Sequence, residues 1–227
     1  MYATMRAWLG KNIRWIAHVS ALAPLVLLGF DALTDTLGAN PIQEITLRTG
    51  KTALLLLISS LACTPFNTVF GFPPIIKVRR ELGLYAFLYV CVHFLIFALI
   101  DYGLDTDLVY EAIFEKPYAL VGFTALVLLL PLAVTSTKAW QKRLRKKWKS
   151  LHKLAYVVTG LAVVHYVWLV KSDYREPLAW GALVVVLLIL RLSPVKRSIL
   201  MVRSRIRTRR AQTVRSSLAT SVVKSQN

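Results

Sequence analysis

Residues 81–101 read ELGLYAFLYVCVHFLIFALID, and between Glu81 and Asp101 there is no lysine, arginine, aspartate or glutamate. At about 1.5 Å of rise per residue, a helix of this length crosses most of the roughly 30 Å hydrocarbon core of a bilayer. Because lipid offers no partner for backbone N–H and C=O groups, a single run of this kind forms a helix rather than an isolated strand. The stretch therefore predicts a transmembrane helix.

Similar apolar runs recur along the chain, and 56% of its 227 residues are hydrophobic, above the roughly 45–50% that is usual in soluble proteins. We expect Trp180 and Arg191 to anchor the last and shortest run at the membrane interface. The fold class that we predict is all-α, an integral membrane bundle of about six transmembrane helices formed by residues 1–192. The predicted spans are about 13–33, 51–69, 81–101, 117–136, 152–170 and 177–192.

The charged residues divide the connecting segments into two kinds. Lysine and arginine without any acid fill the segment before the first span, the loop after the second and the loop from Lys138 to Lys149. The loop after the third span is acidic, and the loop after the fifth is neutral. Because cytoplasmic loops are enriched in lysine and arginine, we expect both termini to be cytoplasmic. The protein is then a multi-pass membrane protein.

The net charge of +18 is a second consequence of this distribution. A basic protein can bind nucleic acid through one clustered patch, but here the cations flank apolar runs, so membrane lipid is the expected partner and nucleic acid is not. The basic tail 193–227 is rich in serine and threonine. We expect it to be disordered or to lie on an anionic membrane surface in the cytoplasm.

His93 and His165 lie in the third and fifth predicted spans at matched depth. Each follows the predicted cytoplasmic end of its span by about 18–20 Å of helix. Two imidazoles at one level on different helices suit axial ligation of a haem iron, and aromatic residues are frequent in both spans. Interhelical hydrogen bonds are the alternative reading of the same pair. The aromatic residues are Tyr85, Phe87, Tyr89, Phe94, Phe97, Tyr156, Tyr166 and Trp168.

His152, Arg79 and Arg80 form a second candidate cluster at the predicted cytoplasmic end. His152 is level with the two arginines, and the third span offers no histidine there as a partner. His152 and His165 are about 140° apart around an ideal helix, so they share a face only if a bulge near Gly160 changes the phase. His152 is therefore a ligand of a second haem, a contact of a flavin, a quinone or a haem propionate, or simply an interfacial base.

Several blocks resemble the ferric-reductase-like transmembrane family over about residues 10–192. They are Thr64-Pro65-Phe66 with Gly71, the stretch 79–85 (RRELGLY) that leads to His93, and the stretch 148–156 (WKSLHKLAY) that leads to His165. The block 165–177 (HYVWLVKSDYREP) is similar to the haem-binding membrane subunits of bacterial methionine sulfoxide reductase systems.

The resemblance implies b-type haem, and FMN as a further cofactor, with His93 and His165 as haem ligands and His152 as an additional cofactor histidine. It also implies electron transfer from the quinone pool or a cytoplasmic flavin reductase to a periplasmic molybdopterin enzyme that repairs oxidised methionine. No flavin or nicotinamide domain follows the bundle in this sequence, so we expect a separate donor.

Two other functions remain open at this point. A transmembrane ferric reductase would use the same haem ligands but deliver electrons to metal outside the cell. A haem-free transporter or assembly factor would need neither ligand, but transporters often have interrupted helices near the midplane. Here Pro24 and Pro131 are the only such interruptions.

Overall fold

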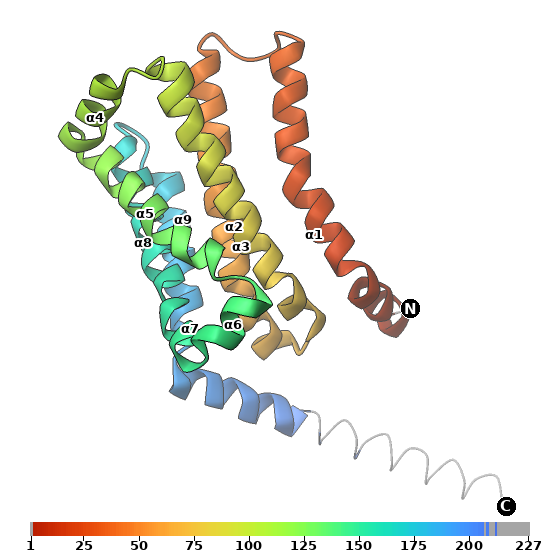
Figure 1. The fold of residues 1–227 in the computed structure, drawn as a ribbon. Coiled ribbons are helices and arrows are strands. Elements are labelled where there is room, and N and C mark those ends of the chain that lie inside the picture. Colours follow the sequence, from red (N-terminus) through yellow and green to blue (C-terminus); the bar gives the residue numbers. More distant parts are fainter. Residues whose placement is uncertain (1, 207, 209–211, 213–227) are drawn as a thin grey trace, which may run out of the picture.

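A computed structural model describes residues 2–206, 208 and 212, and every regular element among them is helical (Figure 1). Ile96–Asp101 forms a π-helical continuation of α3, and a further helix, Ser193–Ile206, follows α9. The elements in chain order are α1 (Tyr2–Leu33), α2 (Pro41–Phe70), α3 (Pro74–Leu95), η1 (Ile96–Asp101), α4 (Thr106–Glu115), α5 (Pro117–Val134), α6 (Lys138–Leu144), α7 (Lys146–Leu151), α8 (Leu154–Leu169) and α9 (Arg175–Ile189).

Local sequence explains where α2 begins and ends. Asn40 precedes the helix, and its side-chain oxygen accepts the backbone N–H of Gln43, while Pro41 occupies the first turn, where its missing N–H costs nothing. At the other end Gly71 adopts a left-handed conformation with φ 64°, which favours glycine because it has no Cβ. Helix α2 is longer than the apolar run 51–69, because polar residues that we expect outside the hydrocarbon core of the bilayer extend it.

The fold class is confirmed as an all-helical membrane bundle. Within the part of the chain that the structure describes, four helices are long and apolar enough to cross a membrane, namely α1, α2, α3 with η1, and α5. The helices α8 and α9 have 16 and 15 residues, and α9 reaches the required length only together with Ser193–Ile206, from which it is bent by 73°. The count of six spans and the cytoplasmic position of the termini stay predictions.

The connecting segments gather at two opposite ends of the bundle (Figure 1). The α2–α3 turn, α6, α7 and the helix Ser193–Ile206 lie at one end, together with the N-terminus. The α1–α2 loop, α4 and the α8–α9 loop lie at the other. The basic segments therefore share one end, which we call the basic end, and the acidic α4 belongs to the opposite end.

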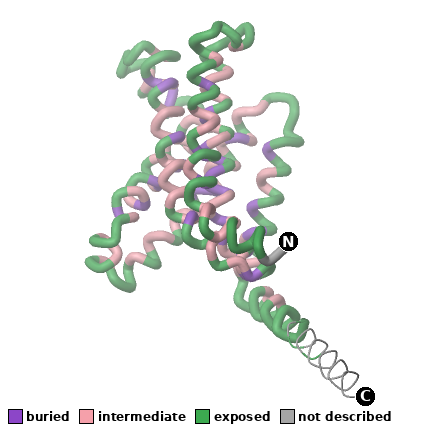
Figure 2. Tube along the Cα trace, turned by 90° about the vertical axis from the view of Figure 1, so that its right-hand side faces the viewer, coloured by how far each residue is buried: buried purple, intermediate pink, exposed green. Residues whose placement is uncertain are grey.

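The core lies between α2, α3, α5 and α8. Its buried members include Leu57, Ala86, Ala125, Leu129 and Val158, one or more from each of these helices. Figure 2 shows most of the buried residues along the middle of the bundle, with exposed residues at its ends and along the outer faces of the helices. Large apolar side chains that remain exposed, many of them on α1, suit a surface that contacts lipid rather than water.

The predicted tail begins with a regular helix. Arg203 of Ser193–Ile206 donates to the backbone carbonyls of Asn67 and Thr68, the last turn of α2, at 3.3 Å each, where a cation complements the helix dipole. The first part of the tail, residues 193–206, is thus helical in the structure, and a position on an anionic membrane surface stays a prediction. Nearly all of the tail beyond Ile206 lies outside the described residues.

Candidate functional site

The structure brings His93 of α3 and His165 of α8 together inside the bundle. Their ring centres are 6.3 Å apart, and the ring planes are inclined at 85°. Both rings line one cavity of about 250 Å³ between α2, α3, α5 and α8. The two histidines for which the sequence predicted a matched depth are therefore direct neighbours in the structure.

Backbone carbonyls determine which nitrogen of each ring carries the proton. Nδ1 of His93 lies 2.9 Å from the carbonyl oxygen of Thr46, and Nδ1 of His165 lies 2.7 Å from that of Tyr118. A carbonyl can only accept, so Nδ1–H is the donor in both bonds. In the neutral rings Nε2 then carries a free lone pair, the tautomer that metal-ligating histidines adopt when their other nitrogen donates to a carbonyl.

A glycine lies against each of the two rings. A Cβ atom at Gly50 would be 3.0 Å from Cε1 of His93, and one at Gly122 would be 2.7 Å from Nδ1 of His165. Each glycine is one helical turn after the carbonyl that accepts from the same ring. Any larger residue would therefore push the imidazole away from its acceptor.

The two halves of this site repeat each other. Thr46 and His93 are separated by 47 residues, and so are Tyr118 and His165. Gly50 and Gly122 also precede their histidines by equal distances in the sequence. The pair α2–α3 and the pair α5–α8 thus hold their histidines by the same arrangement of a carbonyl and a glycine one turn apart.

The residues present fit a haem better than a bare metal ion. Within the described part of the chain there is no group of three or more histidine, cysteine, aspartate or glutamate side chains that could hold an ion, whereas a porphyrin supplies its own equatorial ligands. Bonds between a metal and imidazole nitrogen are about 2 Å long, so two axial rings on one metal have centres about 6 Å apart. The observed separation is 6.3 Å.

Only some of the aromatic residues suggested by the sequence line this cavity. Phe94, Phe97 and Tyr166 do, and Phe123, Tyr102 and Tyr118 join them from other elements. Tyr85 and Tyr89 instead face α1: the hydroxyl of Tyr85 lies 2.9 Å from Nδ1 of His18, and that of Tyr89 donates to the Ala21 carbonyl at 2.8 Å. His18 of α1 therefore makes a contact with α3 outside this cavity.

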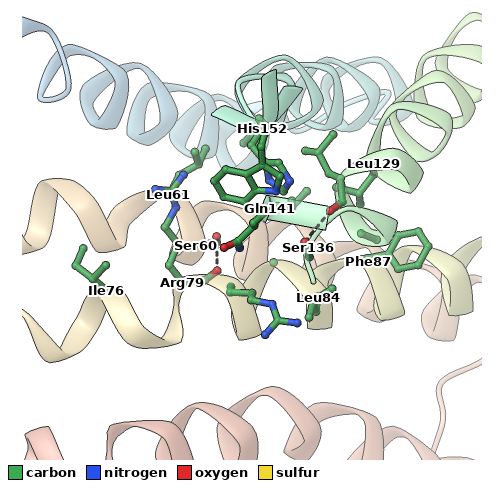
Figure 3. A pocket seen from close by; sticks show the side chains of 18 residues that line it. Ser60, Leu61, Ile76, Arg79, Leu84, Phe87, Leu129, Ser136, Gln141 and His152 are labelled. Atoms are coloured by element: carbon green, nitrogen blue, oxygen red, sulfur yellow. Dashed lines mark hydrogen bonds between the residues drawn. The ribbon is translucent and has the colours of Figure 1, made fainter. Parts of the chain in front are cut away.

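His152, Arg79 and Arg80 line a second cavity, of about 190 Å³, nearer the basic end of the bundle. Figure 3 shows His152 across this pocket from Ser60 and Arg79. Nε2 of His152 is 3.2 Å from the hydroxyl of Thr135, and the indole ring of Trp148 lies over the imidazole with 4.0 Å between ring centres. The three residues singled out in the sequence are thus neighbours, with Arg79 half-buried and Arg80 exposed.

The structure has no bulge near Gly160 that would change the helical phase. Residues 154–169 form a regular α-helix, and His152 precedes it in the turn after α7. Because His152 lies outside α8, the angle of about 140° that applies to two residues of one continuous helix does not apply to His152 and His165. Among the described residues that line the second cavity His152 is the single histidine, so an iron held there would need a ligand of another type.

The two cavities adjoin each other. Leu57 and Leu129 line both of them, and both leucines are buried in the central core. A layer of aliphatic side chains therefore separates the His93–His165 pair from the His152 pocket. Redox groups in the two cavities would face each other across this layer in a water-poor interior.

Sequence reasoning missed the two glycines and the two carbonyl acceptors. The glycines had a detectable signal, because each is isolated in or beside an apolar span and both stand at the same distance from a histidine. Small residues in transmembrane helices commonly mark close packing. The carbonyl acceptors of Thr46 and Tyr118 had no signal in the sequence, because every residue type carries the same backbone carbonyl.

Comparison with known proteins agrees with this architecture. Residues 49–163 match the family described as ferric reductase like transmembrane component. The chain is 45% identical over 179 residues to the protein-methionine-sulfoxide reductase heme-binding subunit MsrQ of Xanthomonas axonopodis pv. citri, with 76% of this chain and 82% of that protein covered. A protein of the same name from Herminiimonas arsenicoxydans is 42% identical over 182 residues, with 79% and 84% covered. No solved structure matches the chain.

Proposed function

The chain belongs to the ferric reductase-like transmembrane family and, within it, to the MsrQ heme-binding subunits; from this membership we propose that it carries electrons across a bacterial inner membrane through b-type haem held between His93 and His165. The single observation that carries the proposal is the pair of imidazoles, 6.3 Å apart, whose Nδ1 atoms both face backbone carbonyls. Haem supplies a one-electron centre whose potential depends on its axial ligands and their hydrogen bonds.

The protein's own residues orient the two ligands and keep water out. The carbonyls of Thr46 and Tyr118 hold the rings by their Nδ1–H groups, and Gly50 and Gly122 let the rings approach those carbonyls. Such outer hydrogen bonds raise the basicity of a ligating imidazole and fix its orientation. The apolar and aromatic walls lower the local polarity, which is a second influence on a redox potential.

The His152 cavity is the proposed point at which electrons arrive. It lies toward the basic end, which we expect to be cytoplasmic because cytoplasmic loops are enriched in lysine and arginine. We propose that it receives electrons from the quinone pool or from a cytoplasmic flavin reductase, with FMN or a second haem against His152, Arg79 and Arg80. The arginines supply the positive charge that a phosphate or a propionate needs.

The proposed acceptor is a periplasmic molybdopterin enzyme that reduces methionine sulfoxide in proteins. The support is the name of the relatives, which are heme-binding subunits of a protein-methionine-sulfoxide reductase. On the end opposite the basic segments, α4 carries exposed carboxylates together with exposed Leu108, Tyr110 and Phe114. This helix is the proposed docking region for that partner.

An absorption spectrum tests the central proposal. Purified protein from cells with adequate haem supply should show a Soret band that shifts on dithionite reduction, and His93→Ala and His165→Ala should each abolish it. His18→Ala is the matched control, because His18 also lies in an apolar helix but contacts Tyr85, and neither residue lines the cavity of His93 and His165. A colourless wild-type protein, or an unchanged spectrum in both ligand variants, would refute the assignment.

A second experiment separates this function from that of a ferric reductase. Reduced protein in vesicles is mixed either with the periplasmic sulfoxide reductase and methionine sulfoxide or with a ferric chelate. The proposal requires the haem band to return to its oxidised position with the enzyme and its substrate together. Reoxidation by the ferric chelate alone would favour metal reduction.

A further inference from the structure

A third cavity lies beside the His152 pocket at the basic end of the bundle. Its volume is about 240 Å³, and it is enclosed by the last turns of α2, the first turns of α3 and α8, and the bend after α9. Its wall is formed by Thr64, Pro65, Thr68, Arg79, Tyr156, Leu190, Arg191 and Lys196. Only Arg79 is shared with the His152 pocket.

Three cations face this cavity, and none of its described lining residues is acidic. Arg191 is half-buried; its terminal nitrogens donate to the hydroxyl of Tyr156 and to the carbonyl of Leu61. Its Nε is buried and has no partner among the described residues. Two guanidinium groups and an ammonium group thus share one small space, and the described residues that line it supply no negative charge.

Physical chemistry favours an anion in such a place. Like charges held together in a partly dehydrated space repel each other, and removing one of them from water is costly unless an opposite charge compensates. The planar fork of arginine matches the oxygens of phosphate, and lysine adds a point charge. The hydroxyl of Tyr156 accepts from Arg191, so its own proton is free for an anion.

The neighbouring helix supports a position at the membrane surface. Ser193–Ile206 leaves α9 at 73° and exposes Leu200, Met201, Val202 and Ile206 alongside its basic residues. A helix with this combination is typical of the interface between headgroups and acyl chains. Basic pockets between transmembrane helices on the cytoplasmic side are suited to anionic headgroups.

We propose that the cavity formed by Arg79, Arg191 and Lys196 is a binding site for a phosphate group, supplied either by the headgroup of an anionic phospholipid or by a small soluble phosphate. The site shares Arg79 with the His152 pocket, but neither histidine of the haem pair nor His152 lines it. A bound phosphate would join α2, α3, α8 and the segment after α9 at one point. Its expected effect is therefore stabilisation of the bundle at this end.

Thermal unfolding of the full-length haem protein in a neutral detergent tests the proposal. The probes are phosphatidylglycerol, phosphatidylcholine as the uncharged reference lipid, and inorganic phosphate against chloride at equal ionic strength. The test variant is Lys196→Gln, which removes one cation from the wall, and Lys142→Gln on exposed α6 is the control with the same change in net charge. Arg191→Lys is a second variant that retains the charge but loses the fork.

Wild-type protein and Lys142→Gln should show saturable stabilisation, with about tenfold weaker binding in Lys196→Gln, the loss expected for one charge-assisted hydrogen bond. Stabilisation by phosphatidylglycerol alone identifies a lipid headgroup as the source, and an equal effect of inorganic phosphate identifies a soluble ligand. The Soret band should stay unchanged in both glutamine variants. Absence of saturable stabilisation in the wild-type protein, or equal weakening in Lys196→Gln and Lys142→Gln, would overturn the proposal.

Discussion

Replacing Gly122 by alanine tests the proposed haem site through a residue that is not itself a ligand. The new Cβ would lie 2.7 Å from Nδ1 and 2.9 Å from Cε1 of His165. Ordinary van der Waals contact with a Cβ atom begins at 3.4 Å, so the imidazole ring of His165 must move by about 0.7 Å. Metal–ligand distances tolerate about 0.2 Å, and the same movement would lengthen the 2.7 Å hydrogen bond from His165 to the Tyr118 carbonyl.

The expected result is a large loss of haem without a loss of helix. Disturbing a hydrogen bond behind a metal ligand typically lowers affinity by about 10–100-fold. Alanine is about 1 kcal/mol better than glycine inside a helix, so the substitution alone favours the fold of α5. Gly50→Ala should have a smaller effect, because its Cβ would meet the edge of His93 at 3.0 Å.

The assay is the ratio of Soret to protein absorbance in purified variants, with the helix content followed by circular dichroism. Gly160→Ala is the matched control: it lies in α8 near His165, and a Cβ there meets nothing within 4 Å. The reasoning predicts haem loss in the order Gly122, Gly50, Gly160. Full haem content in Gly122→Ala, or an equal loss in Gly160→Ala, would refute it.

Three further outcomes follow from other contacts. Tyr89→Phe should destabilise the protein by about 1 kcal/mol, seen as a lower midpoint of thermal unfolding, because the buried hydroxyl of Tyr89 ties α3 to a backbone carbonyl of α1 at 2.8 Å. Lys51→Gln breaks the 2.7 Å ion pair with Glu176, whose side chains are 45% and 48% exposed, so it should cost less than about 1 kcal/mol and nothing at high salt. His152→Ala should retain a Soret band from the other cavity, and a loss as complete as in His93→Ala would contradict the separation of the two sites.

The candidate site was predictable in part. The histidines were visible in the sequence because an ionisable residue in an apolar span is rare and costly. Their depth could be compared by counting residues, because the helical rise is constant. The acceptors of their Nδ1 protons lie on α2 and α5, far away in sequence, and no residue type distinguishes a carbonyl that accepts a ring proton from one that does not.

The facing surfaces of the helices were not predictable for a related reason. In water an apolar stripe shows which side of a helix is buried. In a membrane the outer side is apolar as well, so periodicity carries little information. Leu57 in the core and Leu55 on the exposed surface of α2 are the same residue type with opposite surroundings.

By itself the sequence determined that this protein is a helical membrane bundle, because hydrophobic length and unpaired backbone groups allow little else in lipid. Caps such as Asn40 and Gly71 are also local, since their partners lie within a few residues. Only the tertiary structure decided that His93 meets His165 against a glycine and a carbonyl, and that Arg191 faces Arg79 across a cavity. These contacts depend on the rotation of each helix about its axis, which packing between side chains sets and composition does not.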